Sequence, residues 1–157
     1  MNGNDIHVKM CEVRVGSAPQ VLRSTLGSCV GIGILWRERN LCALAHCLLP
    51  HSQTRAAQPS AKYVTDAVPS LLQLIGAAPS HYHQLEAIVA GGACMVYHRR
   101  QSLNGLIGEQ NTDMAQRLLA DAGIHVVHTE IGGISGRQLS IHCDTQQYVV
   151  RTFERIN

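Results

Sequence analysis

Two apolar runs joined by a short charged segment constrain the fold of this chain most strongly. Residues 30–36 (VGIGILW) and 41–48 (LCALAHCL) are almost entirely apolar, and the segment between them is polar (RERN). The pattern predicts a β-hairpin, because strands that are buried on both faces form continuous apolar runs. We therefore expect this hairpin inside a layered fold, with other elements packed on each side.

Strand and helix patterns alternate along the rest of the chain. Strands are expected over residues 6–15 with a bulge, 21–26, 85–90, 124–130, 138–143 and 148–153. One helix is expected where Val64, Val68, Leu71, Leu72 and Ile75 share a face, between Ser60 as N-cap and Gly76 as C-cap, with a kink or restart at Pro69. A second should follow a loop through Asn104-Gly105, with Met114, Leu118, Leu119 and Ala122 on its apolar face, and should end at Gly123. The sequence thus predicts one α/β domain over residues 1–157, a layered sandwich of mixed β-sheets flanked by helices.

Composition excludes several classes of partner. Hydrophobic residues make up 45% of the chain and charged residues 15%, which indicates a folded globular protein. The net charge is +2 and basic residues do not cluster beyond Arg99-Arg100, so a nucleic-acid partner is not expected. Membrane insertion is not expected either, because no apolar run approaches the roughly 20 residues that a span needs. The N-terminal residues lack the pattern of a signal peptide, and we expect a cytoplasmic protein.

The six cysteines do not form a Cys-x-x-Cys pair. In a reducing compartment we expect them to be small core residues or a reactive thiol rather than disulfides. Histidine-containing groups occur at His46-Cys47, His81-x-His83, His125-x-x-His128 and His142-Cys143-Asp144, none with zinc-finger spacing. We therefore expect neither a metal nor a cofactor.

Cys29 stands in a turn of small residues between two expected strands. It follows Leu26-Gly27-Ser28 and precedes Val30. A tight turn of this kind can expose a side chain and point consecutive amides at one spot, as an oxyanion hole requires. Cys29 is therefore a candidate nucleophile, and the alternative is a buried structural thiol.

His46 lies near the end of the second strand of the expected hairpin. If residues 36–41 form the turn, Cys29 and His46 reach the same edge of the sheet from neighbouring strands. A thiol with the reference pKa of about 8.5 is mostly protonated at pH 7, so an imidazole that accepts its proton would activate it. The alternative for His46 is a hydrogen-bonded core histidine.

The chain resembles a known family, the chemoreceptor glutamine deamidases called CheD. Residues 26–30 (LGSCV) and 46–50 (HCLLP) are similar to the family's Leu-Gly-Ser-Cys-Val and His-x-x-Leu-Pro motifs, with the same seventeen-position separation of Cys29 and His46. Residues 91–93 (GGA), 107–111 (IGEQN) and 132–137 (GGISGR) look like the family's later glycine-bearing motifs, in the same order. The resemblance extends over nearly the whole chain.

The resemblance implies a Cys-His-Thr site that converts receptor glutamine side chains to glutamate, on a fold shared with toxin deamidases of the cytotoxic necrotizing factor type. The family's threonine lies six positions before the cysteine, and this position holds Arg23 here. Thr25 has the same strand parity as Arg23, and we expect it to take the orienting role; Ser24 would face away unless the strand bulges.

Other residues of the family motifs are candidates for substrate contact. Ser28 lies beside the expected nucleophile, and Asn111 and Arg137 either contact the substrate or brace their turns. Gln110 replaces an arginine usual in the family, which weakens a structural ion pair or alters a binding surface. We also expect the polar loop over residues 51–60 to border the groove that admits the substrate.

The resemblance also implies the partners. These are methyl-accepting chemotaxis receptors and, for some relatives, a CheC-like phosphatase that restrains the deamidase. The alternative to an enzyme is a non-catalytic chemotaxis adaptor with a weakened active site, for which Arg23 at the threonine position is the main support.

Overall fold

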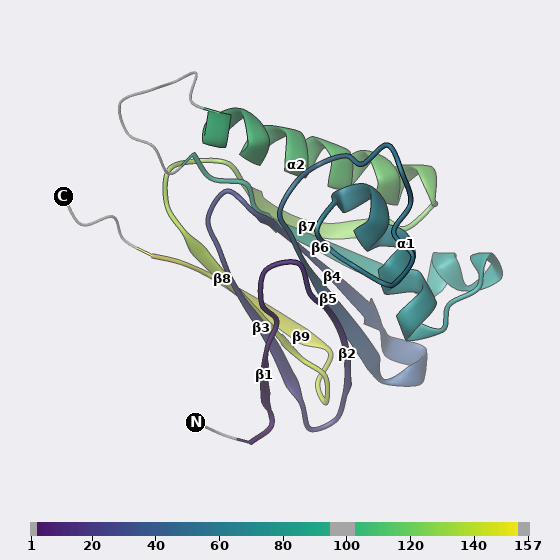
Figure 1. The fold of residues 1–157 in the computed structure, drawn as a ribbon. Coiled ribbons are helices and arrows are strands. Elements are labelled where there is room, and N and C mark those ends of the chain that lie inside the picture. Colours follow the sequence, from purple (N-terminus) through teal and green to yellow (C-terminus); the bar gives the residue numbers. More distant parts are fainter. Residues whose placement is uncertain (1–2, 95–102, 154–157) are drawn as a thin grey trace.

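Two β-sheets and two α-helices build the protein in the computed structural model, which describes residues 3–94 and 103–153 (Figure 1). The strands are β1 (Asp5–His7), β2 (Val13–Ser17), β3 (Val21–Leu26), β4 (Val30–Trp36), β5 (Leu41–Cys47), β6 (Glu86–Gly91), β7 (His125–Ile131), β8 (Arg137–His142) and β9 (Gln147–Thr152). The helices are α1 (Val64–Ile75) and α2 (Leu103–Asp121), with short 3-10 helices η1 (Arg37–Arg39) and η2 (Pro79–Gln84).

The elements form three layers. One sheet has the strand order β1-β3-β8-β9 and the other has the order β2-β5-β4-β6-β7, and both mix parallel with antiparallel pairs. Helices α1 and α2 cover one face of the five-stranded sheet, and the four-stranded sheet packs on its other face (Figure 1). The expected α/β class with mixed sheets and flanking helices is confirmed.

The central hairpin is confirmed with the expected pairing. Strands β4 and β5 pair from Trp36 opposite Leu41 to Val30 opposite Cys47, and every residue of β4 is buried. Even-numbered residues of β4 face the helices, and the odd-numbered ones face the other sheet. A Cβ atom at Gly31 would lie 2.8 Å from a Leu26 methyl group, so the absence of a side chain lets the two sheets approach closely.

The N-terminal segment differs from the prediction of one bulged strand. β1 pairs in parallel with β3 in one sheet, whereas β2 pairs antiparallel with β5 in the other. Residues 8–12, which we call the crossing segment, carry the chain between the sheets, and Cys11 adopts a φ of 73° there. Apolar residues change parity in this segment, between Met10 and Val13, and such a change fits a bulge within one strand as well as a change of sheet.

Both expected helices are present with changed beginnings. Tyr63 rather than Ser60 is the N-cap of α1, and Gly76 ends it in the left-handed conformation as expected. The helix continues through Pro69, although the ring removes one backbone donor. Helix α2 begins at Leu103, inside the expected loop, and Gly108 there packs against the backbone of Gly92. Tertiary packing thus overrides the low helix propensity of glycine.

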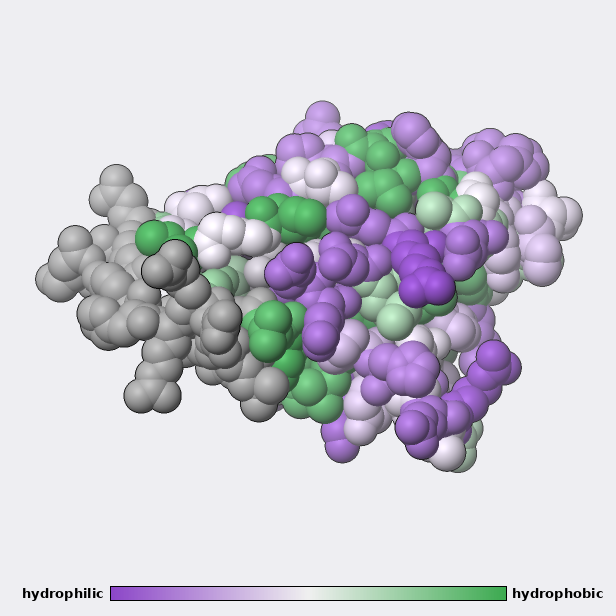
Figure 2. Space-filling model, turned by 90° about the horizontal axis from the view of Figure 1, so that it is seen from above, coloured by the Kyte–Doolittle hydropathy of each residue, from purple (hydrophilic) through white to green (hydrophobic). Residues whose placement is uncertain are grey.

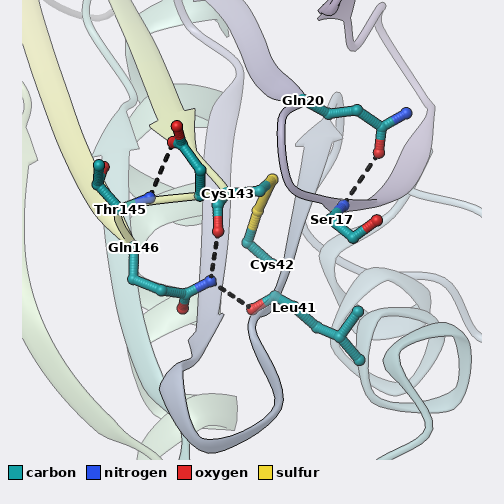
Figure 3. Close-up of a disulfide and its surroundings, with 8 residues drawn as sticks. Ser17, Gln20, Leu41, Cys42, Cys143, Thr145 and Gln146 are labelled. Atoms are coloured by element: carbon teal, nitrogen blue, oxygen red, sulfur yellow. Dashed lines mark hydrogen bonds between the residues drawn. A yellow bond between two sulfur atoms is a disulfide. The ribbon is translucent and has the colours of Figure 1, made fainter.

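The prediction that the cysteines form no disulfide was wrong. Cys42 of β5 and Cys143, directly after β8, are joined by a disulfide between the two sheets (Figure 3). Gln146 lies beside it and donates from Nε2 to the carbonyl oxygens of Leu41 and Cys143, at 3.2 and 3.1 Å. The two cysteines are 101 positions apart, so only the folded chain brings them together.

The helical side of the molecule presents a mosaic of hydrophilic and hydrophobic residues (Figure 2). Leu74 and Leu106 are exposed apolar residues of α1 and α2. Among residues 3–94 and 103–153, no helix is both long enough and apolar enough to cross a membrane.

Candidate active site

The turn that carries Cys29 is fixed to the end of β6 by backbone hydrogen bonds. The amide of Gly92 donates to the carbonyl oxygen of Cys29 at 2.8 Å, and the amide of Ala93 donates to that of Gly27 at 2.9 Å. Cys29 keeps only 5% of its surface exposed. The Cys29 side chain is therefore largely shielded from solvent.

The strand register brings Cys29 and His46 to neighbouring positions. His46 pairs with Gly31 and Cys47 with Val30, so Cys29 lies one step beyond the pairs of β4 and diagonally across from His46. Both side chains belong to the face between the sheets, since Cys29 packs with that core and Cys47 packs with the core under the helices. Diagonal neighbours on paired strands lie within reach of long side chains.

A hydrogen bond with the crossing segment orients the His46 ring. Its Nδ1 atom lies 3.1 Å from the carbonyl oxygen of Val8 in the crossing segment. The hydroxyl of Ser24 donates to the same oxygen at 2.8 Å, and Ser24 is fully buried. The backbone of His46 is also bonded, because its amide donates to Glu12 and its carbonyl accepts from Cys11.

The protonation of the pair follows from burial. Burial lowers the pKa of His46, the hydrogen bond with Val8 opposes this, and the nearby His7 and Glu12 shift the pKa down and up respectively. Burial raises the pKa of the Cys29 thiol, the nearby Cys11 thiol raises it further, and a backbone hydrogen bond lowers it. The resting pair is thus a neutral imidazole beside a protonated thiol, which suits a base that accepts the thiol proton when the substrate is bound.

Thr25 does not take the place that we expected for it. It lies exposed on the outer face of the four-stranded sheet, and Arg23 on the same face pairs with Asp5 at 3.5 Å. Ser24 instead faces the other sheet together with Leu22 and Leu26. These two leucines decide which face of β3 is buried, and their shared parity with Ser24 is the sequence signal that the prediction of Thr25 overlooked.

Asn111 braces the site from helix α2 and is shielded from solvent. Its Nδ2 atom donates to the carbonyl oxygens of Ser28 at 3.2 Å and Leu48 at 3.1 Å. It thereby ties the turn that carries Cys29 to the end of the strand that carries His46. Asn111 has no exposed surface, so of the two roles considered for it the structure supports bracing.

Arg137 is a second internal brace. It is 7% exposed, and its Nη1 atom donates to the carbonyl oxygen of Gly91 at 3.0 Å. The amide of Gly132 donates to the same oxygen at 3.0 Å. Gly91 has a φ of 110°, and a Cβ atom there would lie 2.3 Å from the carbonyl oxygen of Cys29. The glycine-bearing motifs therefore meet behind the turn of Cys29.

Gln110 lines a surface groove, and most of the polar loop over residues 51–60 lies away from that groove. Gln110 lines a groove of about 370 Å³ together with Pro50, His51, Asp113, Met114 and Arg117. It is exposed there, which favours an altered binding surface over a lost structural ion pair. Only the first residue of the expected loop, His51, borders this groove, whereas the middle of the loop packs on α1, where the amide of Ala56 donates to Asp66.

A cysteine in a tight turn with a histidine on the adjoining strand is the arrangement that a thiol-dependent hydrolase uses to pair its nucleophile with a base. The family model described as "CheD chemotactic sensory transduction" matches residues 48–152, and the chain belongs to this family. The "Probable chemoreceptor glutamine deamidase CheD" of Bdellovibrio bacteriovorus is 37% identical over 88% of each chain. The "Probable chemoreceptor glutamine deamidase CheD 2" of Ruegeria sp. is 32% identical over 98% of this chain and 94% of its own. A protein with the same printed name from Geobacter metallireducens is 36% identical over 96% and 94%.

Proposed function

We propose that this protein hydrolyses side-chain amides of chemoreceptor glutamines to glutamates, with Cys29 as nucleophile and His46 as general base and acid. The observation that carries the proposal is the placement of Cys29 directly before β4, diagonally across from His46 of β5 and on the same face, in a chain of the CheD family. The printed names of the relatives, which are glutamine deamidases, support the choice of substrate.

The first half-reaction transfers the acyl group to the enzyme. His46 accepts the thiol proton through Nε2 while the sulfur of Cys29 bonds to the amide carbon. Backbone amides of the turn at Ser28 and Cys29 stabilise the resulting oxyanion. The carbon–nitrogen bond then breaks, and His46 returns the proton to the nitrogen, which leaves as ammonia.

Water completes the reaction. His46 accepts a proton from the water molecule as its oxygen bonds to the thioester carbon, and the carbon–sulfur bond breaks. The sulfur of Cys29 recovers a proton, and the product is a glutamate carboxylate on the receptor. Each turnover consumes one water molecule and releases one ammonia, and it replaces a neutral amide by a charged group that alters receptor packing.

The test is incubation of a receptor cytoplasmic fragment with the full-length protein, followed by mass spectrometry of its glutamine-containing peptides. Conversion of amide to acid is expected with the wild-type protein and not with Cys29→Ala. Cys47→Ala is the matched control, because Cys47 is a neighbouring buried thiol on the opposite face of the sheet. Equal conversion by wild type and Cys29→Ala, or none by either, would refute the proposed enzyme and favour the non-catalytic adaptor.

Ammonia release in the same reaction tests the second partner. We propose that a CheC-like phosphatase binds this protein and restrains it, as the family resemblance implies. Adding such a protein should slow ammonia release in proportion to complex formation. Unchanged release in the presence of a stable complex would contradict restraint.

A further inference from the structure

We propose that the backbone carbonyl of Val8, held in place by the Ser24 hydroxyl, positions His46 for deamidation and fills the orienting position for which Thr25 was expected. The inference rests on the function proposed above, because it assigns a positioning role in that reaction. It means that the third member of the site is a main-chain carbonyl of the crossing segment and not a side chain.

The geometry around Val8 is specific. Its carbonyl oxygen is shared by His46 Nδ1 at 3.1 Å and by Ser24 Oγ at 2.8 Å. Val8 and Ser24 have no exposed surface, and His46 is 5% exposed. Water is thus kept from competing for this oxygen, and both donors rely on it.

The crossing segment is attached to both sheets, which fixes where the carbonyl points. The amide of Val8 donates to the carbonyl oxygen of Arg23 at 2.7 Å and extends the parallel pairing of β1 with β3. Three residues later the amide of Cys11 donates to the carbonyl oxygen of His46 at 2.8 Å. The segment therefore bridges β3 and β5, and Val8 lies between Ser24 and His46.

A carbonyl oxygen only accepts hydrogen bonds, and this decides the state of the ring. Nδ1 must carry the hydrogen, which leaves the lone pair on Nε2 for the thiol proton. A carboxylate in this position would favour the charged imidazolium more strongly than a neutral carbonyl does. The Val8 carbonyl thus orients His46 while leaving it a neutral base, which matches the protonated thiol of Cys29.

Adjacent residues of β3 provide matched variants. Ser24→Ala removes the donor that holds the carbonyl, whereas Thr25→Ala removes the neighbouring hydroxyl on the outer face. Loss of one buried hydrogen bond should lower kcat for receptor deamidation about five- to tenfold, with KM unchanged. Ser24→Thr should restore most of the rate, and Thr25→Ala should match the wild type.

A backbone substitution tests Val8 directly. Cys11 permits native chemical ligation of a synthetic peptide of residues 1–10 to the remainder of the chain. An ester in place of the Val8–Lys9 amide weakens the Val8 carbonyl as an acceptor. The control ester replaces the next linkage, Lys9–Met10, and weakens the Lys9 carbonyl, which accepts from the Glu12 amide instead.

The expected readout of the Val8 ester is a lower kcat with a shifted pH profile. The carbonyl favours the protonated ring, so weakening it should move the acid limb of the deamidation rate to lower pH. The side chains of His7 from β1 and Glu12 from the crossing segment, which act on His46, are kept in both esters, as are the thiols of Cys11 and Cys29. The Val8 ester also removes the Lys9 amide that donates to Glu12 Oε1 at 2.8 Å, so both esters are also compared in a Glu12→Gln background, where this carboxylate is absent. A purely structural defect would lower the folded fraction without moving this limb.

The outcomes separate the two proposals. If Cys29→Ala and His46→Ala are inactive but the Val8 ester behaves as the control ester does, the positioning role is refuted and the deamidase stands. Loss of activity in Thr25→Ala with a normal Ser24→Ala variant refutes it as well. If Cys29→Ala deamidates receptors as the wild type does, the proposed function itself fails. Should Ser24→Ala fail to fold, the esters decide the question.

Discussion

Removal of the Cys42–Cys143 disulfide should destabilise the fold and spare the site. The disulfide closes a loop with a sequence separation of 101, and loop-closure entropy for this length gives about 4.7 kcal/mol of stabilisation at 25 °C. A domain of ordinary stability has about 5–15 kcal/mol in total, so the loss is a third or more of it. Because the disulfide joins the two sheets (Figure 3), the loss falls on their packing.

The assay is urea unfolding of the double variant Cys42→Ala/Cys143→Ala beside the oxidised wild type. The urea concentration at half-unfolding should fall. The free energy of unfolding should depend slightly more steeply on urea concentration, because the unfolded chain without the cross-link exposes more surface. Thermal unfolding should shift downward by roughly 10–20 °C. Cys47→Ala is the control, since it shortens a buried cysteine of the same strand that is not in the disulfide.

Activity should survive in the fraction that stays folded. His46 lies four positions after Cys42 in β5, which is about 13 Å at roughly 3.3 Å per residue. Receptor deamidation per folded molecule should therefore equal that of the wild type at low temperature. A loss of stability below about 1 kcal/mol relative to the control would refute the loop-entropy reasoning.

The site itself yields further expectations. Asn111→Ala should reduce the free energy of unfolding by about 2–4 kcal/mol in urea titrations, because two buried carbonyls lose their donor, and an unchanged midpoint would contradict the brace. Gly91→Ala should lower the free energy of unfolding by at least about 2 kcal/mol and reduce the deamidation rate, because a Cβ atom would overlap the Cys29 carbonyl oxygen. A fully active variant with wild-type stability would contradict this packing. The acid limb of kcat/KM should lie below about pH 6.5, because burial lowers the pKa of His46, and stability should decline as pH falls below that value. In a His46→Ala variant, the rate of Cys29 alkylation should rise with pH with a midpoint above the ordinary pKa of a thiol, because burial raises the pKa of Cys29. A pH midpoint at or below the ordinary pKa would show an exposed sulfur.

The hairpin and the pairing of Cys29 with His46 could be predicted because both depend on local pattern. The apolar runs fix β4 and β5, and the polar residues between them fix the register. The disulfide could not be predicted in this way. Nothing near Cys42 or Cys143 in sequence distinguishes them from the other cysteines, and only the stacking of two sheets brings them into contact.

The orienting group of His46 shows a different limit of sequence reasoning. A side chain such as Thr25 can be proposed from its type and parity, but a backbone carbonyl has no residue type to recognise. Val8 acts through an oxygen that any residue would supply, and its position depends on the crossing segment, which the sequence pattern presented as one continuous strand.

The later motifs of the chain support the turn of Cys29 from behind. Gly91 accepts from Arg137, Gly92 donates to Cys29, and Asn111 donates to Ser28, so three distant segments hold one turn. Buried braces of this kind fix the nucleophile but do not touch the receptor. Selection among receptor glutamines must therefore come from exposed residues, and the groove that Gln110 lines on α2 also includes Pro50, two residues after Leu48, whose carbonyl Asn111 braces. A change at Gln110 should alter which glutamines react, whereas a change at Asn111 should lower all rates together.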